Sequence, residues 1–93
     1  MPISGLNRQL SAVNQQYSAR FVPAPDESVD DEIEILLAGA KTRWGIQIGD
    51  GDFVVNEYGF DPNGELEWAK AHAMVSNLKR AGLALCALLQ QQP

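Results

Sequence analysis

The two most reactive side chain types in this sequence occur once each, as His72 and Cys86. A zinc site draws its ligands from several histidines and cysteines, so this pair supplies too few. A catalytic thiol needs an activating base, and fourteen residues separate the two positions. In its apolar segment Cys86 is expected to behave as a small hydrophobic residue. We therefore expect neither a metal site nor nucleophilic catalysis from these residues.

Asp50, Asp52 and Asn56 have a spacing that superficially resembles a calcium-binding loop. Val55 stands where an EF-hand loop needs glycine, and the closing glutamate is missing. The acidic side chain in Gly49-Asp50-Gly51 would repel a phosphate, so a phosphate-binding loop is not expected either. The sequence therefore predicts a protein that is not an enzyme and that needs no metal or cofactor.

Acidic residues are concentrated in the middle of the chain. From Asp26 to Asp61 there are ten acidic residues and only two basic ones, Lys41 and Arg43, and the formal net charge of the whole chain is -5. Such a chain repels phosphate backbones, so we expect no direct binding of nucleic acid. The same field favours a protein partner with a basic surface.

The length of 93 residues predicts one domain, 1–93, with a modest core. The 45% hydrophobic and 20% charged residues are typical of globular proteins, which argues against general disorder. No apolar run reaches the roughly 18 residues that cross a membrane. The single cysteine and the absence of signal-peptide features near the N-terminus favour a cytoplasmic protein.

Four apolar residues near the N-terminus recur at helical spacing: Leu6, Leu10, Val13 and Tyr17. This spacing predicts a helix over residues 4–20, capped by Ser4, that gives way to extended chain near Arg20. The alternation of Tyr17, Ala19 and Phe21 would also fit a strand. Two prolines in the following segment predict a linker at 21–28.

Residues 29–38 fit two structures. Ser28 followed by several acids is typical of a capped helix start, and an apolar face then recurs at helical spacing, which favours a helix. The alternation in Glu32-Ile33-Glu34-Ile35 is typical of a strand instead. The following segment, 43–58, predicts a β-hairpin, because two β-rich stretches flank the turn sequence Gly49-Asp50-Gly51-Asp52.

The last third of the chain predicts one long helix over residues 62–90, with Asp61 as its N-cap and Pro62 at its first position. About 28 helical residues would span roughly 42 Å, which exceeds the diameter of a compact domain of this size. The last turns are apolar on every side, so they must be buried. The sequence leaves open whether this end is buried within the monomer, by the N-terminal helix or through a bend at Gly82, or is covered by a second subunit. In the second case, the candidate residues for self-association in a homodimer are Leu85, Leu88 and Leu89.

These elements predict a small α+β domain in which the hairpin packs against the C-terminal helix. The candidate surface for a basic protein partner consists of acids with two nearby aromatic residues, because aromatic side chains often anchor interfaces. Its members are Asp30, Asp31, Glu32, Glu34, Asp50, Asp52, Trp44 and Tyr58. The alternative function is a homo-oligomeric structural or assembly protein that pairs through its C-terminal helix.

At the level of class, the chain resembles the small acidic accessory proteins that phages encode against bacterial defences, including anti-CRISPR proteins. The resemblance depends on size, acidity, the strand Trp44-Gly45-Ile46, the turn Asp50-Gly51-Asp52 and the alanine- and leucine-rich segment that follows. It implies an inhibitor in the host cytoplasm that binds a basic, nucleic-acid-handling defence complex. No residue role is carried over, because no family motif is matched.

Overall fold

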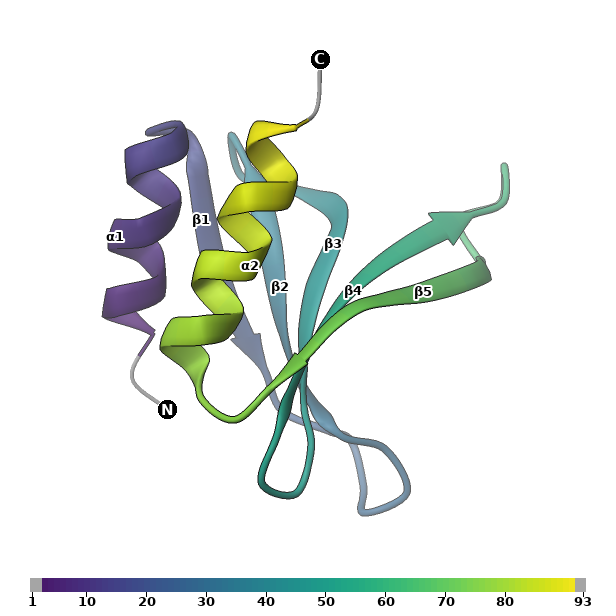
Figure 1. The fold of residues 1–93 in the computed structure, drawn as a ribbon. Helices are drawn as coiled ribbons and strands as arrows, with labels where there is room; N and C mark the ends of the chain where they lie inside the picture. Colours follow the sequence, from purple (N-terminus) through teal and green to yellow (C-terminus); the bar gives the residue numbers. More distant parts are fainter. Residues whose placement is uncertain (1–2, 92–93) are drawn as a thin grey trace.

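Five strands follow one another in chain order to form a single antiparallel sheet, and one helix precedes and one follows them. The computed structural model describes residues 3–91 of this α+β domain (Figure 1). Its elements are α1 (Ser4–Val13), β1 (Tyr17–Val22), β2 (Asp31–Leu37), β3 (Ala40–Ile48), β4 (Phe53–Phe60), β5 (Leu66–Val75) and α2 (Leu78–Gln90). The predicted fold class is therefore confirmed, although three of the predicted elements differ.

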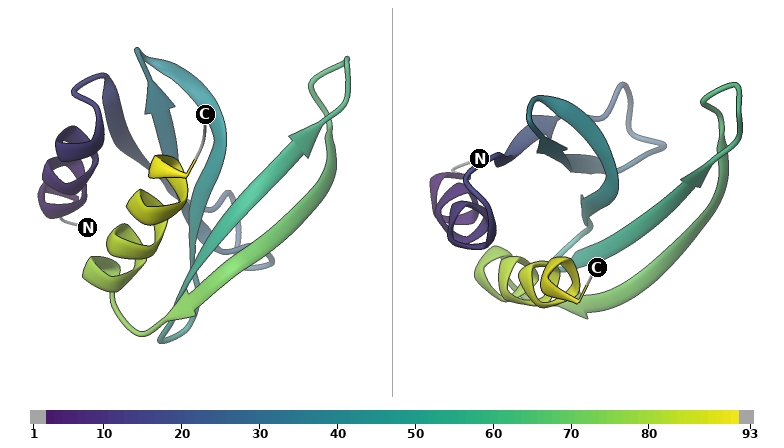
Figure 2. Two further views of the ribbon diagram at one scale, coloured as in Figure 1. Left: turned by 45° about the horizontal axis from the view of Figure 1, so that its top comes forward. Right: turned by 90° about the horizontal axis from the view of Figure 1, so that it is seen from above.

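The two helices lie side by side on the same face of the sheet, α1 against β1 and α2 against β4 and β5 (Figures 1 and 2). Each helix buries the stripe that its apolar spacing predicts, Leu6 and Leu10 in α1 and Leu85 and Leu89 in α2. The strands contribute alternate residues to the same core: Ile33, Ile35, Trp44, Ile46 and Val55. The core is thus one layer between the helices and the sheet.

Glycine at position 82 allows a close approach of the helices rather than a bend in α2. Gly82 is buried inside the continuous helix, and a Cβ there would lie 1.9 Å from Oε1 of Gln9 in α1. The side chain of Gln9 also donates a hydrogen bond to the carbonyl of Lys79 at 3.1 Å. The alternative in which the N-terminal helix buries this end is therefore confirmed, because α1 and the sheet cover α2 without a bend at Gly82.

The prediction of one helix over residues 62–90 is wrong. Residues 66–75 form β5, which pairs with β4 from Phe53–Val75 to Phe60–Leu66. Asp61 caps a hairpin turn instead of a helix, because its Oδ1 accepts the N–H groups of Asn63 and Glu65, both at 2.9 Å. The real helix has 13 residues and is about 20 Å long. It fits within a domain that measures 34 × 33 × 21 Å.

The favoured helix over residues 29–38 is also wrong, and the strand alternative is confirmed. In β2, Ile33 and Ile35 are completely buried, whereas the alternate residues Glu32 and Glu34 are only partly buried. The strand preference of the β-branched residues Ile33 and Ile35, which face the core from alternate positions, thus outweighs the helical spacing of apolar residues in 29–38. The hairpin predicted over 43–58 is confirmed as β3 and β4.

The N-terminal helix is shorter than predicted. It ends at Val13, and its N-cap is Ile3 rather than Ser4, without a side chain cap. The strand alternative is confirmed for the remainder, because β1 pairs with β2 from Tyr17–Leu37 to Val22–Glu32. The linker predicted at 21–28 is shifted accordingly, since Phe21 and Val22 belong to β1.

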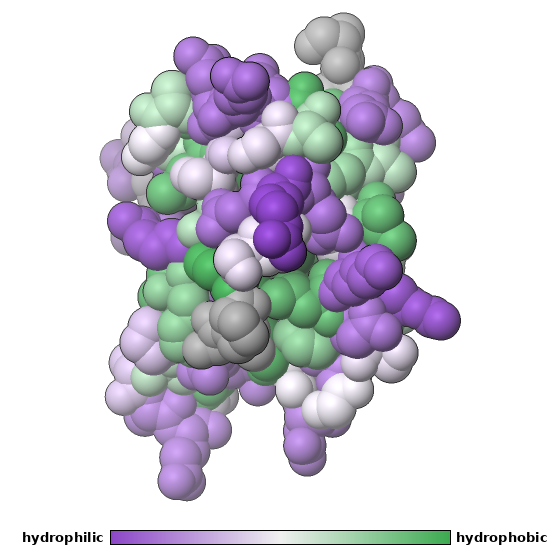
Figure 3. Space-filling model, turned by 90° about the vertical axis from the view of Figure 1, so that its left-hand side faces the viewer, coloured by the Kyte–Doolittle hydropathy of each residue, from purple (hydrophilic) through white to green (hydrophobic). Residues whose placement is uncertain are grey.

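The sheet is strongly twisted, so the far half of the β4–β5 hairpin projects away from both helices (Figure 2). Figure 3 shows the opposite side of the molecule, around α1. Hydrophilic side chains cover most of this face, and hydrophobic side chains lie mainly across the middle of the face. Neither helix within residues 3–91 is long and apolar enough to cross a membrane.

The β2–β3 turn contains the one positive-φ residue that is not glycine among the described residues. Ala38 has a φ of +52° and Gly39 has a φ of +80°, a pair typical of a type I′ turn. Alanine in this left-handed region costs about 1 kcal/mol, and asparagine adopts this conformation more readily.

We expect Ala38→Asn to raise the free energy of unfolding by roughly 0.5 kcal/mol or more, as measured by denaturant unfolding. Ala40→Asn is the control in β3, and equal effects of both substitutions would contradict this explanation.

Candidate protein-binding surface

A polar network occupies the face of the sheet opposite the helices, and four of the eight residues predicted for a partner surface lie in it or beside it. Gln47 donates a hydrogen bond to Asp30 at 2.7 Å, and Asn56 donates to Gln47 at 3.1 Å. Asn56 also donates to the hydroxyl of Tyr58 at 3.2 Å. The other two members, Glu32 and Glu34, lie on β2 next to this network.

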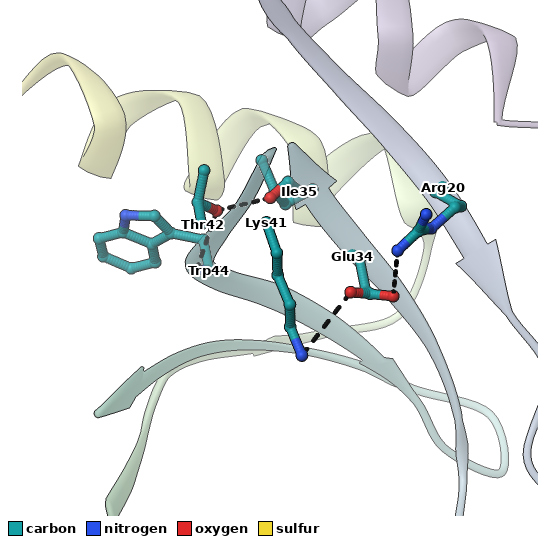
Figure 4. Close-up of polar contacts among 6 residues, drawn as sticks. All are labelled: Arg20, Glu34, Ile35, Lys41, Thr42 and Trp44. Carbon is teal, nitrogen blue, oxygen red and sulfur yellow. Dashed lines mark hydrogen bonds and ion pairs between the residues drawn. The ribbon is translucent and has the colours of Figure 1, made fainter. Parts of the chain in front are cut away.

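Glu34 is largely neutralised by its neighbours. Its carboxylate lies 2.9 Å from the guanidinium of Arg20 on β1 and 3.7 Å from the ammonium of Lys41 on β3 (Figure 4). The Glu34 side chain is only 12% exposed, whereas both bases are more than half exposed. This acid therefore holds three strands together and contributes little free negative charge to the surface.

Glu32 and Tyr58 lie beside each other in partly buried positions. Burial raises the pKa of Glu32, and the nearby charge of Lys41 opposes this rise. Burial also raises the pKa of Tyr58, against the effect of its hydrogen bond with Asn56. Both residues line a shallow cavity of about 220 Å³ that Lys41, Phe60 and Leu66 complete.

The sheet divides next to this cavity. The pairing of β3 with β4 ends at Trp44–Glu57, while β3 continues beside β2 and β4 continues beside β5. A second cavity, of about 360 Å³, lies where the two hairpins diverge, and its lining residues are Lys41, Thr42, Arg43, Phe60 and Gly64. The ammonium of Lys41 lies 5.3 Å from the centre of the Phe60 ring, a cation–π contact across the division.

His72 takes part in a polar cluster with Glu57 and Arg43. Its Nε2 lies 2.9 Å from one oxygen of Glu57, and the other oxygen of Glu57 lies 3.3 Å from Nε of Arg43. The imidazole also packs against Trp44, with ring centres 5.3 Å apart. Residues 3–91 contain no group of three histidine, cysteine or acidic side chains that could hold a metal ion. Burial raises the pKa of Cys86, which disfavours its thiolate.

Three groups of residues that the sequence analysis predicts as binding residues do not lie on the sheet face opposite the helices. Trp44 is a core residue with 5% exposure, so it does not present an aromatic anchor to a partner. Asp31 accepts the backbone N–H of Ala24 at 2.7 Å and thereby closes the β1–β2 loop. Leu85 and Leu89 are buried within the monomer, and Leu88 is partly buried, so the helix does not offer these leucines as a free pairing face.

Five acids without an ion pair among residues 3–91 lie together at one end of the sheet, in the loops 23–30 and 49–52. The pairing of Asp31 with Ile48, and of Ile48 with Phe53, places both loops at that end. Neither loop contains a lysine or an arginine. We call this surface the acidic end; its members are Asp26, Glu27, Asp30, Asp50 and Asp52.

The β4–β5 hairpin carries an apolar surface that the sequence analysis missed. Four large hydrophobic residues are exposed on it: Phe60, Leu66, Trp68 and Met74. The signal was the alternation of residues 66–70, which was hidden because Trp68, Ala71 and Val75 also fit helical spacing.

Comparisons of this chain with protein-family models, with curated proteins and with solved structures found no match.

The raised pKa of Glu32 predicts a pH dependence of stability. Protonation of a carboxyl whose pKa is raised by folding stabilises the folded state, so the contribution is complete below the ordinary pKa of 4.5 and is lost as pH rises through the raised value. Glu32→Gln should remove this decline from the pH profile of the free energy of unfolding. Glu67→Gln, at an exposed position, is the control. Parallel profiles for the two variants would refute the assignment.

Proposed function

We propose that this chain is a non-enzymatic protein-binding module that docks its acidic end onto a basic surface of another protein. The observation that carries the proposal is the separation of charge along the sheet. Two acids in the middle of the sheet have basic partners: Glu34 pairs with Arg20 and Lys41, and Glu57 pairs with Arg43. The acidic end has no such partner in its loops, so its field extends into solvent.

The arrangement supports charge-based recognition more than hydrophobic recognition at this end. Asp26, Glu27, Asp30 and Asp50 are exposed, and Asp52 is partly exposed. Complementary charge increases the association rate and suppresses wrong partners. Two of these carboxylates are held in place before binding, because Asp30 accepts a hydrogen bond from Gln47 and Asp26 accepts one from the backbone N–H of Ser28. Such preorganisation reduces the entropic cost of association.

The specific form that we propose is an inhibitor of a nucleic-acid-handling protein, of the kind that phages produce against CRISPR–Cas defences. Carboxylates at several positions on a rigid end can occupy a groove that otherwise binds phosphates. This mode of action needs no catalytic group. It places the protein in the cytoplasm of the host cell, where such a defence complex acts.

The proposal is tested by removing two charges from the acidic end. The variant Asp30→Asn/Asp50→Asn should lose inhibition, because amides keep hydrogen-bonding capacity but not charge. The measurement is the plating efficiency of a phage on bacteria with active CRISPR–Cas immunity against it, with and without the expressed protein. We expect the unmodified chain to raise plating and the double variant to raise it at least about tenfold less, the effect of roughly 1.4 kcal/mol of binding energy.

The matched control is Glu65→Gln/Glu67→Gln, which removes the same charge from the hairpin tip. This control should inhibit as well as the unmodified chain. Equal losses in both double variants would mean that net charge matters and not the acidic end. Unchanged plating with the unmodified chain, across defence systems of several types, would remove the inhibitor function itself.

A further inference from the structure

The outer edge of β5 is the most exposed part of the sheet. β5 is the last strand in the order β1-β2-β3-β4-β5, and its first six residues, 66–71, are all exposed. At ten residues it is longer than a typical strand of five to six. An edge strand presents a row of unpaired backbone N–H and C=O groups that can pair with another strand. Figures 1 and 2 show that neither helix reaches this edge in the projecting half of the hairpin.

The projecting half of the hairpin also presents apolar side chains. Trp68 is 47% exposed and Leu66 is 59% exposed. The indole of Trp68 lies across Gly59 of β4, because a Cβ at that glycine would be 2.0 Å from Nε1 of the ring. One side of the indole is thus covered by its own hairpin, while much of the ring remains open to a partner.

The exposed charges of β5 lie in its first half. Glu67 is the second residue of the strand and Lys70 is the fifth. Glu67 and Lys70 are both exposed, and neither has an ion-pair partner among residues 3–91. Lys70 alternates with Trp68, so both side chains lie on the same face of the strand. In an antiparallel pair of such strands, the lysine of each strand can face the tryptophan of the other.

We propose that two copies of this chain pair along β5 in an antiparallel arrangement, with the two-fold axis at Ala69. The two sheets then form one continuous sheet of ten strands. This interface is independent of the proposed function, which uses the acidic end of each copy. It is isologous, as expected for a closed dimer.

The contact between Trp68 and Lys70 selects this register. With the axis at Ala69, Trp68 lies opposite Lys70 of the partner copy, an arrangement that permits a cation–π contact. The two-fold axis makes this contact twice. An axis at Lys70 would oppose two ammonium groups, which is less favourable. An axis at Ala71 would place Lys70 opposite His72 and remove the contact with Trp68. An axis at Trp68 would pair fewer residues.

Oligomeric state tests the interface directly. In analytical ultracentrifugation over a micromolar concentration series, we expect a dimer that dissociates on dilution. Ala69→Lys places two ammonium groups at the axis and should weaken dimerisation by about tenfold or more. Leu83→Lys is the matched control, because Leu83 is 58% exposed on α2 and lies outside β5. A monomer at every concentration, or equal weakening by both variants, would overturn the proposal.

Disulfide cross-linking tests the register. In a Cys86→Ala background, Ala69→Cys places two thiols directly opposite each other across the axis, with Cα atoms about 4.5–5.5 Å apart, which is within disulfide reach. We expect mild oxidation to give a covalent dimer. Met74→Cys is the control, because ten residues along the strands would separate the two thiols by about 34 Å. Cross-linking at position 74 but not at 69 would overturn the proposed pairing.

A failure of this proposal is distinguishable from a failure of the proposed function. The variant Asp30→Asn/Asp50→Asn should retain the dimer, since its substitutions lie outside β5. Ala69→Lys should retain the charges of the acidic end. Circular dichroism of each variant confirms that the fold is kept, so that loss of dimerisation is not loss of structure.

Discussion

The whole fold depends on one layer of aliphatic side chains between the helix pair and the sheet. Leu6, Leu10 and Leu85 from the helices meet Ile33, Ile35, Ile46 and Val55 from the strands, and all are essentially inaccessible to solvent. Burial of each such side chain contributes about 1.5–3 kcal/mol. In a chain of this size there are enough apolar residues for one such layer. The opposite face of the sheet is therefore held by ion pairs and hydrogen bonds, and the far half of the β4–β5 hairpin is left uncovered.

The parts of the fold that the sequence predicts are those in which local and long-range preferences agree. In the β3–β4 hairpin, a turn sequence stands between two β-rich strands, and Trp44, Ile46 and Ile48 alternate toward the core. At 66–75 the preferences conflict. Alanines and a helical spacing favour a helix, but β4 needs a neighbour, and the Asp61 turn returns the chain beside it. Pairing that depends on tertiary context is not visible in the spacing of one segment.

The candidate surface was only partly predictable for a similar reason. The sequence shows that acids are concentrated between residues 26 and 61, but it does not show which of them meet a base. Arg20 lies outside that stretch, yet the β1–β2 register places it opposite Glu34. Glu57 meets His72 only because β5 is a strand. The acidic end thus emerges from the pairing of the strands, which places the loops 23–30 and 49–52 at the same end of the sheet.

Because the core is small, it leaves the far half of the β4–β5 hairpin uncovered, and this part of the sheet is available to a second chain. α2 packs against β4 and β5, but its 13 residues are too short to follow the whole hairpin. Long, exposed edge strands are usually protected by charges, bulges or a covering element. The pairing of β5 with β4 is irregular near both ends of β5, and the strand carries the charged residues Glu67 and Lys70. Between these two charged residues, Trp68 is still about half exposed. A second copy, paired as we propose, covers that ring, pairs the edge and places Lys70 of each copy opposite Trp68 of the other.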